Sequence, residues 1–143
     1  MRRVSPLIAL ALAACGGDDG TSTAPRGGGA APVAAGAGGT WPADAPAHAP
    51  PYPGARITGA TRAVSNGVIG SRLGFETDDS PTAVVAFYKA RAERAGLPEV
   101  ATLTNDTTAL YSAGAASGPR INVEASAAGG TTMVALTFSG RPA

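Results

Sequence analysis

A long stretch with almost no large apolar side chains sets the first limit on what this chain can fold into. Residues 16–51 are almost entirely Gly, Ala, Pro, Ser and Thr, and Val33 and Trp41 are the only large apolar residues among them. Such a composition buries too little apolar surface to offset the entropy of ordering the backbone. We therefore expect a disordered tether over this range and a single folded domain over residues 52–143.

Two side chains stand out within the tether. Trp41 is interpreted as a loosely packed aromatic at the domain edge, and the alternatives are docking on a partner or insertion into a headgroup layer. His48 is the only histidine of the chain and lies among alanines and prolines. We expect it to be solvated, because a zinc site needs a cluster of ligands.

The start of the chain has the layout of an export signal. Arg2 and Arg3 precede a short apolar run over residues 4–14. Eleven helical residues rise about 16 Å, which is roughly half the thickness of the hydrocarbon core of a bilayer. The run is therefore predicted to be a signal peptide that is removed, and not a transmembrane helix.

The only cysteine of the chain ends this run. The sequence Leu12-Ala13-Ala14-Cys15, followed by Gly16, resembles the lipobox of bacterial lipoproteins. The resemblance implies cleavage between Ala14 and Cys15, a diacylglyceryl group on the Cys15 thiol, and acylation of the new amino terminus by a fatty acid such as palmitate. An aspartate after the cysteine tends to retain family members in the inner membrane. Gly16 in that position implies the outer membrane, facing the periplasm, over the inner membrane.

The expected organisation has three parts. Residues 1–14 are the lipoprotein signal peptide, residues 15–51 are the lipidated cysteine and its tether, and residues 52–143 are a small α+β domain. Two alternatives remain for Cys15: a free cysteine behind a conventional signal, or part of a cytoplasmic segment with a misassigned start. The formal net charge is +1 and the basic residues are spread out, which argues against nucleic acid as a partner.

Alternating apolar residues predict the strands of the domain. The first two cover residues 57–64 and 67–77 and meet at Asn66-Gly67, a strong hairpin signal. Gly70 and Gly74 are consistent with β-bulges in the second strand. Later strands are expected over four further ranges: 99–104, 107–112, 120–125 and 132–138. The first two of these either pair across Asn105-Asp106 or form one strand that contains a bulge.

A helix is predicted between the second and third strands, over residues 81–95. Ser80 is suited to cap it, Pro81 suits its first position, and Gly96 suits its end. Apolar residues recur at spacings of three and four, which predicts one buried stripe. The expected fold is thus α+β, with an antiparallel sheet of about five strands in the order ββαβββ and one helix packed on one face.

A second resemblance covers roughly residues 52–138. It is carried by Tyr52-Pro53-Gly54-Ala55, Phe75-x-Thr77-x-Asp79-Ser80-Pro81, and Val84-Val85-x-Phe87-Tyr88 with Gly96 closing the helix. These motifs are similar to a small domain that recurs in uncharacterised bacterial exported proteins and lipoproteins. The resemblance implies a fold and a compartment, and no catalytic residues. Leu97 occupies a position where members often carry tryptophan.

Glu76, Asp78 and Asp79 form the only acidic cluster. Acidic residues are common where a helix begins, and the cluster lacks the spacing of a calcium-binding loop. With His48 in the tether and Cys15 acylated, no nucleophile has a base beside it. We therefore expect no enzyme, no catalytic residues, no cofactor and no metal.

The resulting expectation is a membrane-anchored lipoprotein whose domain is a non-enzymatic binding or scaffolding module of the cell envelope. Its partner would be an envelope protein, peptidoglycan or lipid. One alternative is a small metal-dependent hydrolase that uses the carboxylates of Glu76, Asp78 and Asp79. Another is a subunit whose exposed edge strand, over residues 132–138, adds to the sheet of a partner.

Overall fold

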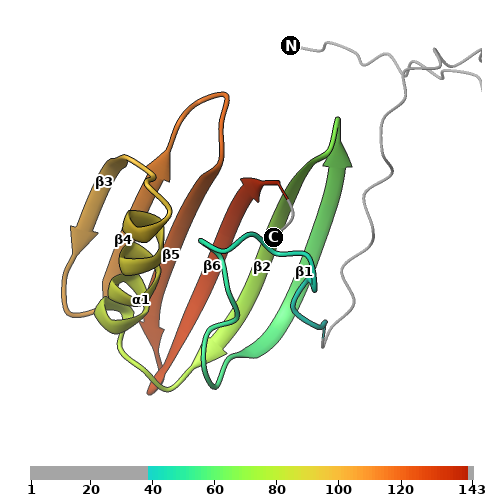
Figure 1. Ribbon diagram of the computed structural model, residues 1–143. Coiled ribbons are helices and arrows are strands. Elements are labelled where there is room, and N and C mark those ends of the chain that lie inside the picture. The colour runs from blue at the N-terminus through green and yellow to red at the C-terminus, as the bar shows by residue number, and fades with distance from the viewer. Residues whose placement is uncertain (1–38, 142–143) are drawn as a thin grey trace, which may run out of the picture.

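The computed structural model describes residues 39–141. The expected signal peptide, the cleavage after Ala14 and the acylation of Cys15 lie outside these residues. The described chain forms one sheet and one helix (Figure 1). In chain order the elements are β1 (Arg56–Ser65), β2 (Val68–Thr77), α1 (Pro81–Arg94), β3 (Glu99–Thr104), β4 (Thr108–Gly114), β5 (Arg120–Ala128) and β6 (Thr131–Gly140).

The six strands form one sheet in the order β1-β2-β6-β5-β4-β3, and every neighbouring pair is antiparallel. The last strand, β6, therefore returns to the middle of the sheet and pairs with β2. This contradicts the alternative in which residues 132–138 form an exposed edge strand, because the edges are β1 and β3. The strands β2 and β3 run in the same direction at distant positions, so α1 serves as the crossover between them.

The expected α+β class with one helix on one face is confirmed, but the expected count of five strands is wrong. The ranges 99–104 and 108–114 are separate strands that pair with each other. Asn105 makes the turn between them. Its side-chain Oδ1 accepts hydrogen bonds from the backbone N–H of Thr107 at 3.0 Å and of Thr108 at 2.7 Å. The order is therefore ββαββββ.

The β1–β2 hairpin turns at Asn66-Gly67, as predicted. Both residues have positive φ, 52° and 73°, which is what a two-residue turn of this kind requires. The expected bulges at Gly70 and Gly74 are not in β2. The irregularity lies in β1, between Ile57 and Gly59. Gly74 makes room for it, because a Cβ there would lie 2.9 Å from Oγ1 of Thr58.

The helix begins and ends as its sequence predicts. The Ser80 side chain accepts a hydrogen bond from the backbone N–H of Ala83 at 3.2 Å, and Pro81 is the first helical residue. After the last turn, the N–H of Leu97 donates to the carbonyl of Ala92 at 2.9 Å. Among residues 39–141, no helix combines the length and the hydropathy needed to span a bilayer.

The core lies on one face of the sheet. One row of it crosses four strands, because Leu73 pairs with Leu136, Leu136 with Val123, and Val123 with Tyr111. All four side chains are buried. The helix lies over β4 and β5 on this face and buries Val84, Val85, Tyr88 and Ala92 against it (Figure 1).

The half of this face that the helix leaves bare is covered by residues 41–55, here called the N-terminal arm. The Tyr52 ring stacks on Phe75 at 5.7 Å and meets the edge of Phe87 at 4.8 Å. Trp41 lies 6.0 Å from Phe75, and its Nε1 donates to the carbonyl of Ala49 at 3.2 Å. The arm therefore joins the sheet to the helix (Figure 1).

The arm corrects the expected boundary of the tether. Residues 41–51 are not a disordered segment, because Ala49 is fully buried and Trp41 packs against the core. Two short turns satisfy part of its backbone, with Ala45 N–H donating to Pro42 and Ala49 N–H to Pro46. The composition of the arm does not reveal this packing, because the apolar surface that the arm covers belongs to the sheet.

The expectation that His48 is solvated is also wrong. Its side chain is 5% exposed and lies against the end of β6, where a Cβ on Gly140 would come within 3.0 Å of the imidazole Cε1. Burial lowers the pKa of His48 from its ordinary 6.5, and backbone groups of Arg120 and Ser139 partly oppose this shift. The folded arm therefore holds a neutral imidazole.

Stability should consequently depend on pH. Above pH 6.5 the imidazole is neutral in both the folded and the unfolded chain, so it has no effect. As the pH falls below that value, the unfolded chain binds a proton that the folded one rejects. The free energy of unfolding then falls with falling pH, until the pH passes the lowered pKa of the folded chain.

The measurement is urea unfolding at about pH 7.5 and about pH 5, compared with the same pair for His48→Gln. The glutamine variant stays neutral, so the loss of stability on acidification should be smaller in it than in the parent chain. An equal loss in both proteins would show that His48 does not carry the pH dependence.

Candidate functional site

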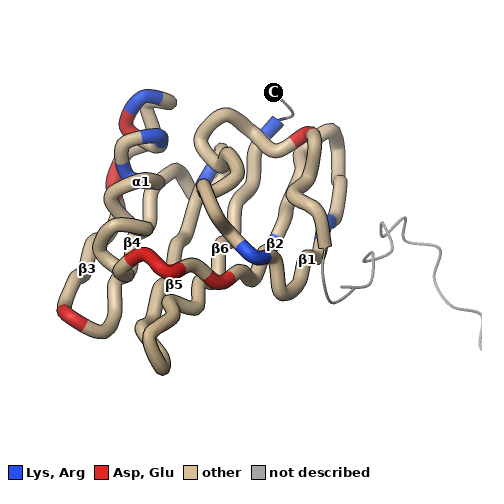
Figure 2. Tube along the Cα trace, turned by 90° about the horizontal axis from the view of Figure 1, so that it is seen from below, with Lys and Arg blue, Asp and Glu red and all other residues tan. Residues whose placement is uncertain are grey.

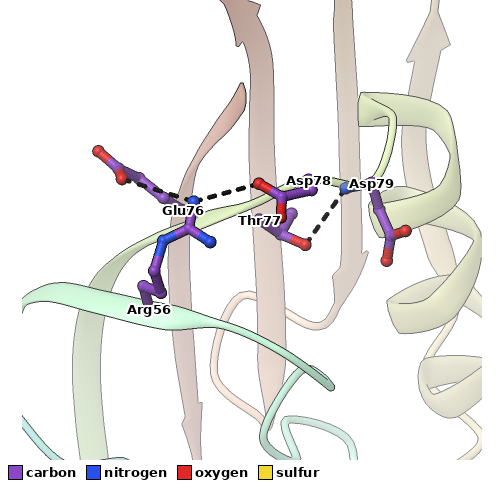
Figure 3. A network of polar contacts seen from close by, with 5 residues as sticks. All are labelled: Arg56, Glu76, Thr77, Asp78 and Asp79. Atoms are coloured by element: carbon purple, nitrogen blue, oxygen red, sulfur yellow. Dashed lines mark hydrogen bonds and ion pairs between the residues drawn. The ribbon is translucent and has the colours of Figure 1, made fainter. Parts of the chain in front are cut away.

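The acidic residues singled out in the sequence lie where β2 leads into α1. Glu76 and Asp78 both face Arg56 of β1, with the guanidinium Nη2 at 4.0 Å from the Glu76 carboxylate and at 3.2 Å from that of Asp78 (Figure 3). These groups are at the surface, so the ion pairs contribute little to stability. Their main effect is that Arg56 offsets one of the two negative charges that would attract a cation.

Asp79 is turned away from this group (Figure 3). Its carboxylate accepts a hydrogen bond from the Tyr52 hydroxyl at 2.7 Å, and its backbone N–H donates to Oγ1 of Thr77 at 3.3 Å. Burial, together with the bond to Asp79, raises the pKa of Tyr52. Asp79 therefore helps to hold the N-terminal arm at the start of the helix.

The structure thus separates the three carboxylates that the sequence placed together. Within residues 39–141, no three His, Cys, Asp or Glu side chains are grouped in a way that could hold a metal ion. What the arrangement offers chemically is an ion pair and an arm contact.

A different feature lies on the uncovered face of the sheet. A groove of about 580 Å³ crosses the strands β1, β2, β6 and β5 near the ends at which β2 and β5 begin. Its floor consists of small side chains that the register aligns, since Ala63 pairs with Gly70 and Gly70 with Ser139. Four neighbouring strands span about 14 Å, so the floor is long enough for about four residues of an extended chain.

The next row of the sheet forms one wall of the groove, and here Thr61 pairs with Arg72 and Arg72 with Thr137. The opposite wall includes residues 116–118 of the β4–β5 loop. Arg120 supports this loop by donating a hydrogen bond from its guanidinium to the carbonyl of Ala116.

The loop starts at a position that only glycine can occupy. Gly114 has a φ of 117°, and a Cβ on it would lie 2.3 Å from the carbonyl oxygen of Pro119. The chain therefore turns tightly at the end of β4, which brings residues 116–118 to the side of the groove.

The chemistry of the groove is that of binding. Arg72 and Arg120 bring positive charge to it, and neither forms a salt bridge within the described chain. Hydroxyls of Thr61, Thr137 and Ser139 add hydrogen-bonding groups beside the small apolar floor. None of the described residues that line it is a His, Cys, Asp or Glu, so the lining supplies no general base at neutral pH.

Sequence reasoning missed this groove. Its signal is the presence of glycine and alanine at outward-facing positions of the hairpin, Gly70 and Ala63, where a strand usually carries larger polar side chains. The sequence could not show that Thr137, Ser139 and Arg120 lie beside them, because the β2–β6 pairing joins segments about 65 residues apart.

No protein-family model, curated protein or solved structure matches this chain. The resemblances to lipoproteins, and to a small exported domain, therefore stay predictions from the residues that carry them.

A metal titration tests whether the carboxylates form a site. A cation bound with a dissociation constant of about 10 μM would, at about 1 mM, stabilise the fold by about 2.7 kcal/mol. In a domain of this size that would raise Tm by more than about 10 °C. We expect no such rise with calcium or magnesium, because Arg56 and Tyr52 already hold these groups.

The matched variants for this titration are Asp78→Asn, within the cluster, and Asp106→Asn, on the exposed turn before β4. A saturable rise in Tm that Asp78→Asn abolishes and Asp106→Asn preserves would contradict the expectation and restore the metal-dependent alternative.

Proposed function

We propose that this chain is a bacterial lipoprotein, anchored through Cys15 to the outer membrane on its periplasmic side. Its domain acts there as a non-enzymatic binding module. The groove on the uncovered face of the sheet receives the partner, which is an envelope protein or peptidoglycan. The observation that carries the binding role is the groove, which combines a floor of small residues with two arginines, Arg72 and Arg120, that form no salt bridge within the described chain.

The two faces of the sheet differ in a way that supports this binding role. One face is covered by α1 and the N-terminal arm, and its side chains form the core. The other face has no cover within residues 39–141 and holds the groove. A domain built in this way can bind a partner without disturbing its core, since the residues that bind are not those that stabilise the fold.

The same geometry disfavours the metal-dependent hydrolase. Glu76 and Asp78 are paired with Arg56, and Asp79 with Tyr52. The groove lies toward the opposite ends of these strands, and Glu76, Asp78 and Asp79 do not line it. A substrate bound in the groove would therefore be remote from the only acidic cluster of the sequence.

The length of the chain before the domain suits a tethered binder. From Cys15 to Trp41 the sequence advances by 26 residues, which extend to no more than about 90 Å. The anchored domain would therefore reach partners within about this distance of the membrane. The tether raises the effective concentration of the domain toward any partner that is held within the same distance of the membrane.

Filling the groove should abolish partner binding and leave the fold intact. A Cβ on Gly70 meets no atom within 4 Å, and its φ is not positive, so Gly70→Leu places a side chain in the groove without backbone strain. Crosslinking in cells, with the recovered partner quantified, should show a drop of about tenfold or more, equivalent to about 1.4 kcal/mol.

The matched control is Gly59→Leu. Gly59 faces the same side of the sheet, meets no atom within 4 Å of a built Cβ, and does not line the groove. Recovery in this variant should stay within about twofold of the parent chain, since the groove remains open. Equal recovery in the Gly70→Leu variant and its parent, with both folded, would contradict the groove as the binding site.

A further inference from the structure

The charges of the domain are separated along the direction of its strands. Residues 39–141 contain eight basic and eight acidic side chains, so their formal charges cancel. They are not evenly placed, however. Basic residues gather at the end of the sheet where β2 and β5 begin, and acidic residues gather at the end where β2 leads into α1.

The basic end is made by Arg94, Arg120 and Arg141. Arg120 is the first residue of β5 and pairs with Ser139, and Arg141 directly follows β6. Arg94 is the last residue of α1, and Arg91 lies in the same turn but directs its guanidinium back over the Phe87 ring, 3.4 Å from the ring centroid. That turn lies at the same end of the sheet, because the carbonyl of Pro98 accepts a hydrogen bond from the N–H of Gly114, the last residue of β4.

Little negative charge offsets these three arginines. Glu99 is bound to Lys89 at 2.7 Å, and Asp44 is bound to Arg62, so each of these pairs is neutral. Glu93 is the other acidic residue of this region, between Arg91 and Arg94 in sequence. Three arginines and one glutamate leave a formal charge of +2 at the basic end.

The opposite end carries the complementary charge. Glu76, Asp78, Asp79 and Asp106 lie there with Arg56, which leaves −3. Figure 2 looks at the domain from this side and shows acidic segments where β2 leads into the helix, with a basic segment beside them. The domain is thus an electric dipole aligned with its strands, although its net charge is zero.

Two exposed aliphatic side chains project beside the arginines. Val64 and Val68 flank the Asn66-Gly67 turn and are 37% and 43% exposed. Val64 pairs with Ile69, and Ile69 with Gly140, which places this turn at the basic end. A basic surface with protruding aliphatic side chains suits an anionic phospholipid layer, where cations meet headgroups and aliphatic groups enter the interface.

We propose that the basic end docks on an anionic phospholipid membrane, with the acidic end directed away from it. The inference rests on the proposed membrane attachment, which keeps the domain within reach of such a surface. Surface attraction of this kind extends over about one Debye length, roughly 8 Å at physiological salt. Docking is therefore reversible, and the lipid anchor makes it frequent by raising the effective concentration.

The test uses the full mature chain, residues 15–143, with Cys15→Ser so that no acyl chain contributes. Cosedimentation is measured with phosphatidylcholine vesicles that contain either no phosphatidylglycerol or about 30% of it, at about 50 mM and about 500 mM salt. We expect binding to the anionic vesicles at low salt only. Equal binding to both kinds of vesicle, or none to either, would overturn the proposal.

Charge variants locate the surface. The double variant Arg94→Glu, Arg141→Glu alters the basic end without touching a residue that lines the groove. The control Arg56→Glu, Arg72→Glu makes the same change in net charge at the acidic end and in the middle of the sheet. The first should weaken vesicle binding about tenfold or more and the second less than about threefold, since screening confines the attraction to nearby charges. Equal losses would overturn the orientation.

A third variant separates a membrane from a soluble polyanion. Val64→Asn removes an exposed aliphatic group and leaves the charge unchanged. It should weaken binding to anionic vesicles and leave binding to heparin unchanged. Equal effects on the two would overturn the membrane as the occupant. The acylation of Cys15 is tested separately, by the intact mass of the native membrane-extracted protein. The docking proposal and the acylation proposal can therefore be contradicted independently of each other.

Discussion

A sheet with one apolar face is stable in water only when that face is covered. The rest of this structure depends on which segments cover it. The helix is too narrow to cover six strands, and it lies over β4 and β5. The N-terminal arm covers the remainder, and Tyr52 is its centre, since this ring touches Phe75 of the sheet and Phe87 of the helix. Its hydroxyl is bound to Asp79 at the start of the helix. Sheet, helix and arm are therefore held at one place.

Local elements of the fold could be read from the sequence because the signals that define them are local. Ser80 and Pro81 fix the start of α1, and Asn66-Gly67 fixes the first hairpin. The central place of β6 and the packing of the arm depend on contacts between distant segments, and no local pattern encodes them. The arm was missed for a further reason. Apolar content measures what a segment can bury of itself, whereas Trp41 and Ala49 cover surface that the sheet supplies.

The candidate site likewise has a part that local sequence suggests and a part that only the folded sheet brings together. Glu76, Asp78 and Asp79 are close in sequence, which suggested one cluster, but Tyr52 draws Asp79 away and Arg56 holds the other two. The groove, in contrast, is assembled from small outward-facing residues of strands that meet only in the folded sheet. Its floor and the charged end of the domain both lie outside the core. Residues of these two surfaces can thus be substituted without loss of stability, because the side chains that stabilise the fold lie on the covered face.

The central claim is that one face of the sheet is the core and the other is free. Leu136 and Thr137 are neighbours in β6 and point to opposite faces: Leu136 is fully buried, and Thr137 is exposed. The most direct measurement is the free energy of unfolding of Leu136→Ala and Thr137→Ala. The account predicts a loss of about 2–5 kcal/mol for Leu136→Ala and of less than about 0.5 kcal/mol for Thr137→Ala. Comparable losses for the two would mean that the second face is also covered, and would contradict the account.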